Sequence, residues 1–168
     1  MPDTDSYCTP AWLAARLGQF DFDPCSNPRS HIDALDFASL ENGDDGLLLP
    51  WNGKIWLNHP YSNPMPWMQK LHQERIAGRC KESMVLAKLD PSTKWWKYLT
   101  DPELGPCDLW VFDKRLQFDC PPGIKPSSNN FCSVLVHHGE LELEFGAPRY
   151  YKPPQLDLSD VATLWRLA

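Results

Sequence analysis

The sequence has little glycine, no long hydrophobic run and no cysteine pattern typical of a metal site. Its six cysteines include no CxxC pair, and no Cys/His group has zinc spacing, so we predict no metal. No apolar stretch approaches the ~20 residues that a membrane span needs. The N-terminus MPDTDSY is acidic and polar, unlike a secretory signal. These absences predict a cytoplasmic protein with reduced thiols and no membrane association.

Positive charge is also scarce. The 16 Lys and Arg residues stand against 22 Asp and Glu residues, for a net charge of -6. This balance argues against strong autonomous binding to duplex DNA, because such affinity depends on neutralising phosphates. A local basic face for transient contact is still possible, and its candidates are Lys94, Lys97, Lys114 and Arg115. A solvated charged surface explains the same four residues equally well.

The residues that are abundant indicate one globular domain. A chain of 168 residues has the size of a single domain, and 42% hydrophobic residues suffice for a core. The 17 prolines, against 9 glycines, predict many fixed turns. We therefore expect one domain over residues 1–168, with residues 1–6 as a flexible tail.

Hydrophobic periodicity predicts an α/β fold. The expected helices are residues 11–18, 64–78, 92–100 and 157–168, and the first would have Thr9 as N-cap and Pro10 at its first position. The expected strands are residues 19–24, 54–58, 83–89, 108–112, 132–137 and 141–145. Residues 26–50 are turn-rich. The alternation of helices and strands predicts a parallel sheet, and the later strands, joined by short turns, predict an antiparallel extension. Binding sites in such sheets lie at the carboxyl ends of the strands.

The segment Asn58-His59-Pro60-Tyr61 directly follows one of these strands and suits the methylation of an exocyclic amine. Such an amine is a poor nucleophile because its lone pair is delocalised into the base. Two acceptors that bind its hydrogens localise that lone pair, and the Asn58 side-chain oxygen and the backbone carbonyl of residue 59 could serve. Tyr61 could stack on a base flipped out of the duplex. Pro60 fixes the turn.

The same segment resembles the (Asp/Asn)-Pro-Pro-(Tyr/Phe) signature of amino methyltransferases. Further segments are similar to the phage-type DNA N-6-adenine methyltransferase family, and the similarity runs over roughly residues 7–137. The segments that carry it are YCTP (7–10), FDFDPCSNP (20–28), DGL (45–47), WNGKIWLNHPYSNPMPWMQK (51–70), LAKLDPSTKWW (86–96) and KRLQF (114–118).

This resemblance implies a compact Rossmann-like sheet that binds S-adenosylmethionine (SAM) and methylates the N6 of adenine in DNA. It also implies a phage or prophage origin. Thr9 and Pro10 resemble a segment that lines the SAM pocket. The cofactor loop of the family corresponds to Asp23, Pro24, Cys25 and Ser26. Asn58, Pro60 and Tyr61 match the catalytic motif.

Two positions depart from the family pattern. His59 stands where the family usually has Pro. The turn is less rigid without the proline ring, but the backbone carbonyl of residue 59 is still present. We expect the His59 side chain to be partly exposed. The loop at 23–26 lacks the glycines common in SAM enzymes, and Asp23 is also explained as the cap of a turn before Pro24.

Two alternatives stay open at this stage. Methylation of cytosine N4 uses the same acceptor chemistry, and Asn at position 58 favours adenine only by resemblance. A catalytically silent SAM-fold module that binds DNA or a protein also fits the acidic charge and His59. No residue pattern indicates the recognition sequence or the oligomeric state, although the irregular stretch 101–131 is a candidate substrate-facing region.

Overall fold

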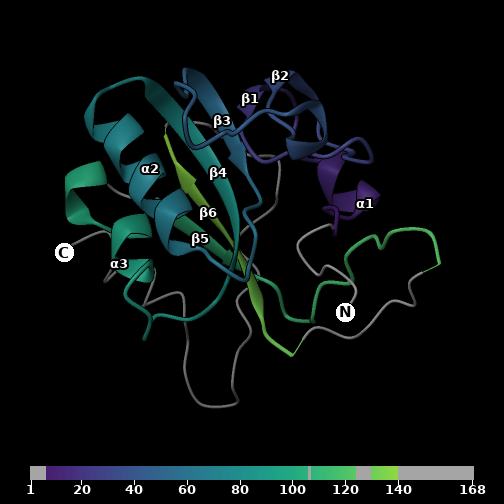
Figure 1. The fold of residues 1–168 in the computed structure, drawn as a ribbon. Helices are drawn as coiled ribbons and strands as arrows, with labels where there is room; N and C mark the ends of the chain where they lie inside the picture. Colours follow the sequence, from purple (N-terminus) through teal and green to yellow (C-terminus); the bar gives the residue numbers. More distant parts are fainter. Residues whose placement is uncertain (1–6, 106, 124–129, 140–168) are drawn as a thin grey trace, which may run out of the picture.

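A computed structural model describes residues 7–105, 107–123 and 130–139, which form a mixed α/β structure around one sheet (Figure 1). The helices are α1 (Ala11–Ala14), α2 (Met65–Ile76) and α3 (Trp96–Leu99), with short 3-10 turns at Leu40–Asn42 and Pro102–Leu104. The strands are β1 (Phe20–Asp23), β2 (Ala34–Phe37), β3 (Gly53–Leu57), β4 (Cys80–Lys88), β5 (Cys107–Val111) and β6 (Ser133–His138). The predicted tail at 1–6, strand at 141–145 and helix at 157–168 lie outside the described residues.

The six strands have the spatial order β2-β1-β3-β4-β6-β5. Strands β2, β1, β3 and β4 pair in parallel, whereas β6 pairs antiparallel with both β4 and β5. The predicted parallel sheet with an antiparallel extension is confirmed: β6 and β5 extend the sheet beyond β4, and β6 is inserted between β4 and β5 out of chain order. Between β1 and β3 the chain changes its direction of travel across the sheet, which is where α/β sheets bind ligands.

The central strands β3, β4 and β6 are buried on both faces, so their side chains divide between two cores. Ile55 and Leu57 of β3 pack in the first core with Met68 and Leu71 of α2. Trp56, which points to the other face, packs in the second core, whose members also include Leu13, Leu17, Leu116 and Phe118. Helices α2 and α3 therefore cover one face, and α1 with the segment 114–118 covers the other (Figure 1).

Several elements differ from expectation at their ends. The helix predicted over 11–18 is α-helical only at Ala11–Ala14, and Pro10, not Thr9, occupies its N-cap position without a side-chain cap. Strand β2 falls in a stretch predicted to be turn-rich. It is only four residues long, and its apolar side chains Leu35 and Phe37 are exposed, so it is not the compact buried run that predicted the other strands. In α2, the apolar Ile76 is exposed, whereas the acidic Glu74 is buried.

Glu74 ties α2 to the loop before β3. Its carboxylate pairs with Lys70 at 2.6 Å and with Arg79, and it accepts the Trp51 backbone N–H at 3.4 Å. Burial raises the pKa of Glu74, but the hydrogen bonds from Arg79, Lys70 and Trp51 outweigh it and lower that pKa to about 2. The buried carboxylate is therefore charged at neutral pH and fully partnered.

Two further expectations concern the thiols and the membrane. All six cysteines are free thiols, as predicted. Among the described residues, no helix is both long and apolar enough to span a bilayer.

Candidate active site

The two predicted motifs follow neighbouring parallel strands at the same edge of the sheet. Asp23 ends β1 and begins the loop to Ser26, while Asn58 directly follows Leu57 of β3. Strands β1 and β3 pair in parallel at Phe22 and Ile55, so their carboxyl ends lie side by side. The motifs thus meet at the switch point of the sheet, where a ligand would contact both.

The side chain of Asn58 is held by Thr9, which comes from the N-terminal segment. Asn58 Nδ2 donates a hydrogen bond to Thr9 Oγ1 at 3.2 Å, and Thr9 is buried. Thr9 precedes Pro10, which occupies the N-cap position of α1, and its side-chain oxygen serves Asn58. With its nitrogen engaged in this way, Asn58 keeps the side-chain oxygen Oδ1 as its acceptor for a ligand.

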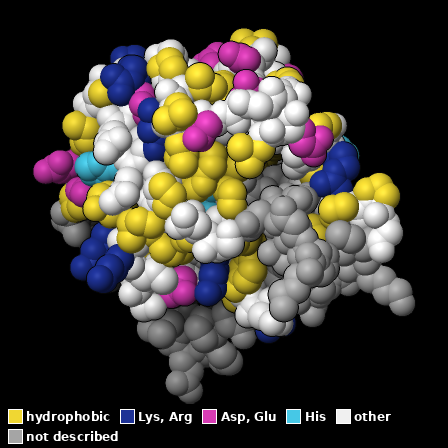
Figure 2. All heavy atoms as spheres, in the orientation of Figure 1, with side chains coloured by type: hydrophobic (Ala, Val, Ile, Leu, Met, Phe, Trp, Pro, Cys, Tyr) yellow, Lys and Arg dark blue, Asp and Glu magenta, His cyan; other side chains and the backbone are white. Residues whose placement is uncertain are grey.

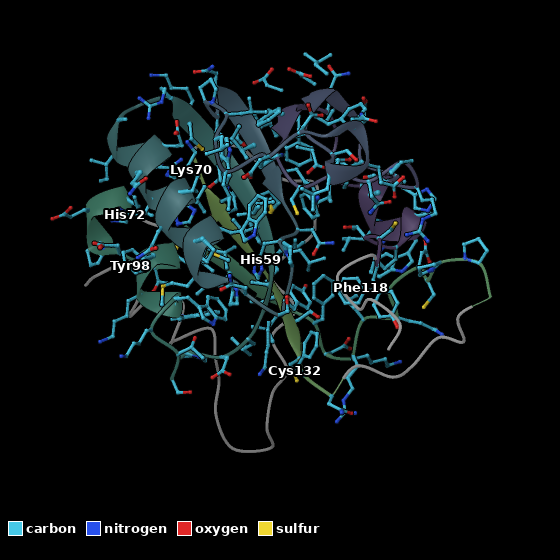
Figure 3. All side chains as sticks on the ribbon, viewed as in Figure 1. His59, Lys70, His72, Tyr98, Phe118 and Cys132 are labelled. Atoms are coloured by element: carbon cyan, nitrogen blue, oxygen red, sulfur yellow. The ribbon has the colours of Figure 1, made fainter. Side chains whose placement is uncertain are left out.

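The imidazole of His59 is buried, and the expectation that it would be partly exposed is wrong. Only 3% of His59 is exposed, and its ring packs edge-on between Tyr61, at 5.2 Å, and Trp95, at 6.1 Å. Its Nδ1 lies 3.0 Å from the Pro60 carbonyl oxygen, to which it donates. Packing and this hydrogen bond restrict the turn and so compensate for the absent proline ring. Figure 3 shows His59 at the centre of the molecule, with Phe118 to its right.

Tyr61 belongs to an aromatic cluster at the second core. Its ring meets Phe118 at 5.8 Å and Phe131 at 5.2 Å, both edge-on. Its hydroxyl is buried and has no hydrogen-bond partner among the described residues. Burial raises the pKa of the phenol, so Tyr61 is neutral at physiological pH. These contacts fix the ring next to the motif, and its stacking on a base stays a prediction.

Asp23 places a buried carboxylate at the end of β1. Its Oδ1 accepts the Cys25 backbone N–H at 3.1 Å, so the turn-capping interpretation is confirmed. Burial raises the pKa of Asp23 to about 7, against the lowering effect of the hydrogen bonds from Cys25 and Ser26. Within the described part of the chain, the carboxylate has no cationic partner.

The loop that begins at Asp23 is braced from two sides, although it lacks glycine itself. The Ser26 N–H donates to the Ala38 carbonyl and the Ala38 N–H to the Asp23 carbonyl, both at 2.9 Å. Gly46 presses on the loop so closely that an added Cβ would lie 1.8 Å from the Pro24 carbonyl oxygen. The Trp51 indole donates to the Gly46 carbonyl at 2.8 Å and holds it there.

From the sequence, Gly46 was noted as a glycine of a turn within the stretch 26–50 and of the DGL segment, and its close approach to Pro24 was not predicted. The glycine itself was the available signal, since a conspicuous glycine between turn residues marks a close approach of two backbones.

The other predicted residues lie near these groups. Pro24 is buried, Cys25 and Ser26 are partly exposed, and Pro10 is buried next to Thr9. Trp95 and Trp96 are both buried, at 8% and 4% exposure. Neither offers a free face for stacking on a base. Lys94, Lys97, Lys114 and Arg115 are all exposed.

Comparison with known proteins gives this arrangement a family. The family model described as DNA N-6-adenine-methyltransferase (Dam) matches residues 1–152. The chain is also 30% identical over 100 residues to the DNA N-6-adenine-methyltransferase of Haemophilus phage HP1 (strain HP1c1), and the aligned stretch is 56% of each chain, so it spans about half of that relative. No solved structure matches the chain significantly. Because the family model covers most of its length, the chain belongs to the DNA N-6-adenine-methyltransferase (Dam) family.

Proposed function

We propose that this protein transfers a methyl group from SAM to the N6 amino group of adenine in DNA. The observation that carries the proposal is the Asn58 side chain, held through its nitrogen by Thr9 at the switch point of the sheet. Membership in the family and the name of the phage relative favour adenine over cytosine N4. The Rossmann-like methyltransferase fold is part of the same proposal, supported by the parallel order β2-β1-β3-β4.

The residues at the end of β1 suit a cationic cofactor. SAM carries a positive sulfonium and an ammonium group, and the buried Asp23 carboxylate supplies an opposite charge beside the braced loop. We propose that Asp23, Pro24, Cys25 and Ser26 hold SAM there, with Thr9 and Pro10 closing the pocket from the N-terminal segment. Bound SAM would supply an electrophilic methyl group.

The chain's own residues would prepare the amine. Asn58 Oδ1 and the backbone carbonyl of His59 would accept hydrogen bonds from the two N–H groups of the adenine amine and direct its lone pair toward the methyl donor. Once the nitrogen has taken the methyl group, it would release one of its two protons to solvent. His59 would keep that carbonyl in place through its bond to Pro60 and its packing against Trp95. Tyr61 would support the flipped base. The chemistry then depends on positioning, and no covalent intermediate with the protein is needed.

Transfer of label from methyl-labelled SAM to unmethylated DNA tests the proposal. We expect the label in N6-methyladenine after digestion to nucleosides. Label in N4-methylcytosine would instead establish the cytosine alternative. SAM binding without any label in DNA would establish the silent-module alternative.

Gly46→Ala should weaken SAM binding about tenfold or more. The new methyl group would overlap the Pro24 carbonyl and displace the loop that follows Asp23. Isothermal calorimetry with SAM measures the effect. Gly43→Ala is the matched control, because Gly43 has a φ of 83° but nothing within 4 Å of an added Cβ, so it tests backbone strain alone. Equal SAM affinity in the Gly46→Ala variant and the parent would contradict the role of this contact.

SAM affinity should rise with pH and level off above about pH 7. The pKa of Asp23 is about 7 without ligand, and a cationic ligand favours the carboxylate, so binding below that pH must release a proton. The expected slope is about tenfold per pH unit below the pKa.

Calorimetry in buffers of different ionisation enthalpy measures the released proton. Asp23→Asn should bind SAM weakly and without this pH dependence, whereas Asp36→Asn, at an exposed position of β2, should behave like the parent. A parent whose affinity is flat across this range would overturn the assignment of Asp23.

A further inference from the structure

An open hollow of about 600 Å³ lies beside the proposed active site. Its walls are the N-terminal segment through α1, the loop before β2, and the chain that follows β5. The lining residues are Cys8, Pro10, Trp12, Arg29, His31, Gln117, Phe118, Asp119, Cys120 and Pro122. Neither Asp23 nor Asn58 is among them, whereas Pro10, which is proposed to close the cofactor pocket, lines the hollow as well, so the hollow adjoins the proposed reaction centre.

The hollow is built on the same residues that hold the active site. Cys8 and Asp119 exchange two backbone hydrogen bonds of 3.0 Å, and the Ala11 N–H donates to Asp119 Oδ2 at 3.2 Å, so its two walls are joined. Pro10 follows Thr9, the partner of Asn58. Phe118 in the lining meets the Tyr61 ring at 5.8 Å. A strand of DNA lying in the hollow could therefore reach the motif.

Trp12 gives this hollow an aromatic surface. It is 50% exposed, although it is one of the largest hydrophobic side chains. Phe112 contacts its ring edge-on at 6.4 Å, and the Arg16 guanidinium lies 5.8 Å from its centre. An exposed indole held in place beside a cation is a typical platform for an unpaired base.

The charges around the hollow favour an anionic ligand. Arg29 lines it, Arg16 lies beside Trp12, and Lys114 and Arg115 are exposed on the segment that supplies Gln117 and Phe118, which also carries the exposed Asp113. Its acidic member, Asp119, is already paired with His31 at 3.1 Å. In Figure 2, basic, acidic and hydrophobic side chains lie together at the side where Figure 1 places α1. These cations suit phosphates and disfavour the cationic SAM.

We propose that the hollow binds the DNA strand next to the target adenine, with Trp12 against a base and Arg16 and Arg29 beside phosphates. The proposal rests on the proposed function, and it names the surface through which an acidic protein engages DNA. Local basic residues supply the attraction that the net charge of -6 does not.

Fluorescence anisotropy with labelled single-stranded and duplex oligonucleotides tests the surface in the full-length protein. Trp12→Ala should weaken binding to the single strand about tenfold or more, and Trp12→Phe should recover part of the loss. Arg29→Gln should weaken all sequences alike and lower the slope of affinity against salt by about one. Ile76→Ala, at an equally exposed hydrophobic position, and Lys81→Gln are the controls and should match the parent.

SAM affinity and thermal unfolding are measured on the same variants. Weaker DNA binding with unchanged SAM affinity and unchanged melting supports the surface. Unchanged DNA binding in Trp12→Ala overturns it, and a selective loss of SAM affinity would show that the hollow is a cofactor pocket instead. If the parent methylates adenine while Trp12→Ala binds DNA normally, only this inference fails. If Trp12→Ala weakens DNA binding but the parent transfers no methyl group, only the proposed function fails.

Discussion

Replacing Asn58 with alanine should lower the rate of methyl transfer about 100- to 1,000-fold while SAM affinity stays unchanged. This magnitude is typical when one preorganised hydrogen-bonding group is removed from an active site. The side-chain oxygen of Asn58 is proposed to accept an amine hydrogen, and no other side chain in the motif replaces it. Single-turnover kinetics with saturating SAM and DNA measure the chemical step directly.

Three further variants separate chemistry from structure. Asn58→Asp keeps an acceptor oxygen and should retain much of the activity. Thr9→Val removes the hydrogen bond of 3.2 Å that orients Asn58 and should cost only about three- to tenfold, with Thr9→Ser close to the parent. Asn52→Ala, at an exposed position directly before β3, is the control. An Asn58→Ala variant with parental single-turnover rates would contradict the role of this side chain.

The second large effect concerns stability. Glu74→Ala should reduce the free energy of unfolding by about 3–5 kcal/mol, because it leaves the Lys70 ammonium and the Trp51 N–H without their shared acceptor. For a chain of this size, that corresponds to a fall of about 10 °C in the melting temperature. Chemical denaturation measures the free energy, and Glu41→Ala, at an exposed position, should stay close to the parent.

This stabilisation should also depend on pH in a defined direction. Because the pKa of Glu74 is lowered from 4.5 to about 2, its contribution is complete above about pH 4.5 and is lost as the pH falls toward 2. The difference between parent and Glu74→Ala should therefore shrink with acidification through this window. A difference that is constant over the window would show that packing, and not the charged network, accounts for the loss.

The sequence predicted the elements with a strong hydrophobic pattern and the place of the motif. The strands around Ile55, Val85 and Val136 were found because their apolar residues form compact runs. The exposed strand β2 was missed, since its pairing with β1 comes from backbone hydrogen bonds and not from burial. The insertion of β6 beside β4 was also beyond reach, because pairing partners depend on the whole sheet.

In the candidate site, too, local segments were predictable from the sequence and long-range contacts were not. Asn58 and Asp23 were identified from their segments, but the bond from Asn58 to Thr9 spans 49 positions and leaves no local trace. The burial of His59 was missed for a related reason, since Trp95, which packs against it, comes from a distant turn. Long-range contacts thus supply the rigidity that the local motif lacks.

The structure of the protein in complex with a SAM analogue and a short duplex tests the central claim most directly. We expect the analogue to lie beside Asp23 at the end of β1. We expect the flipped adenine to place its amino nitrogen within hydrogen-bond distance of Asn58 Oδ1 and the His59 carbonyl. An adenine bound away from Asn58, or an analogue bound away from Asp23, would contradict the proposed active site.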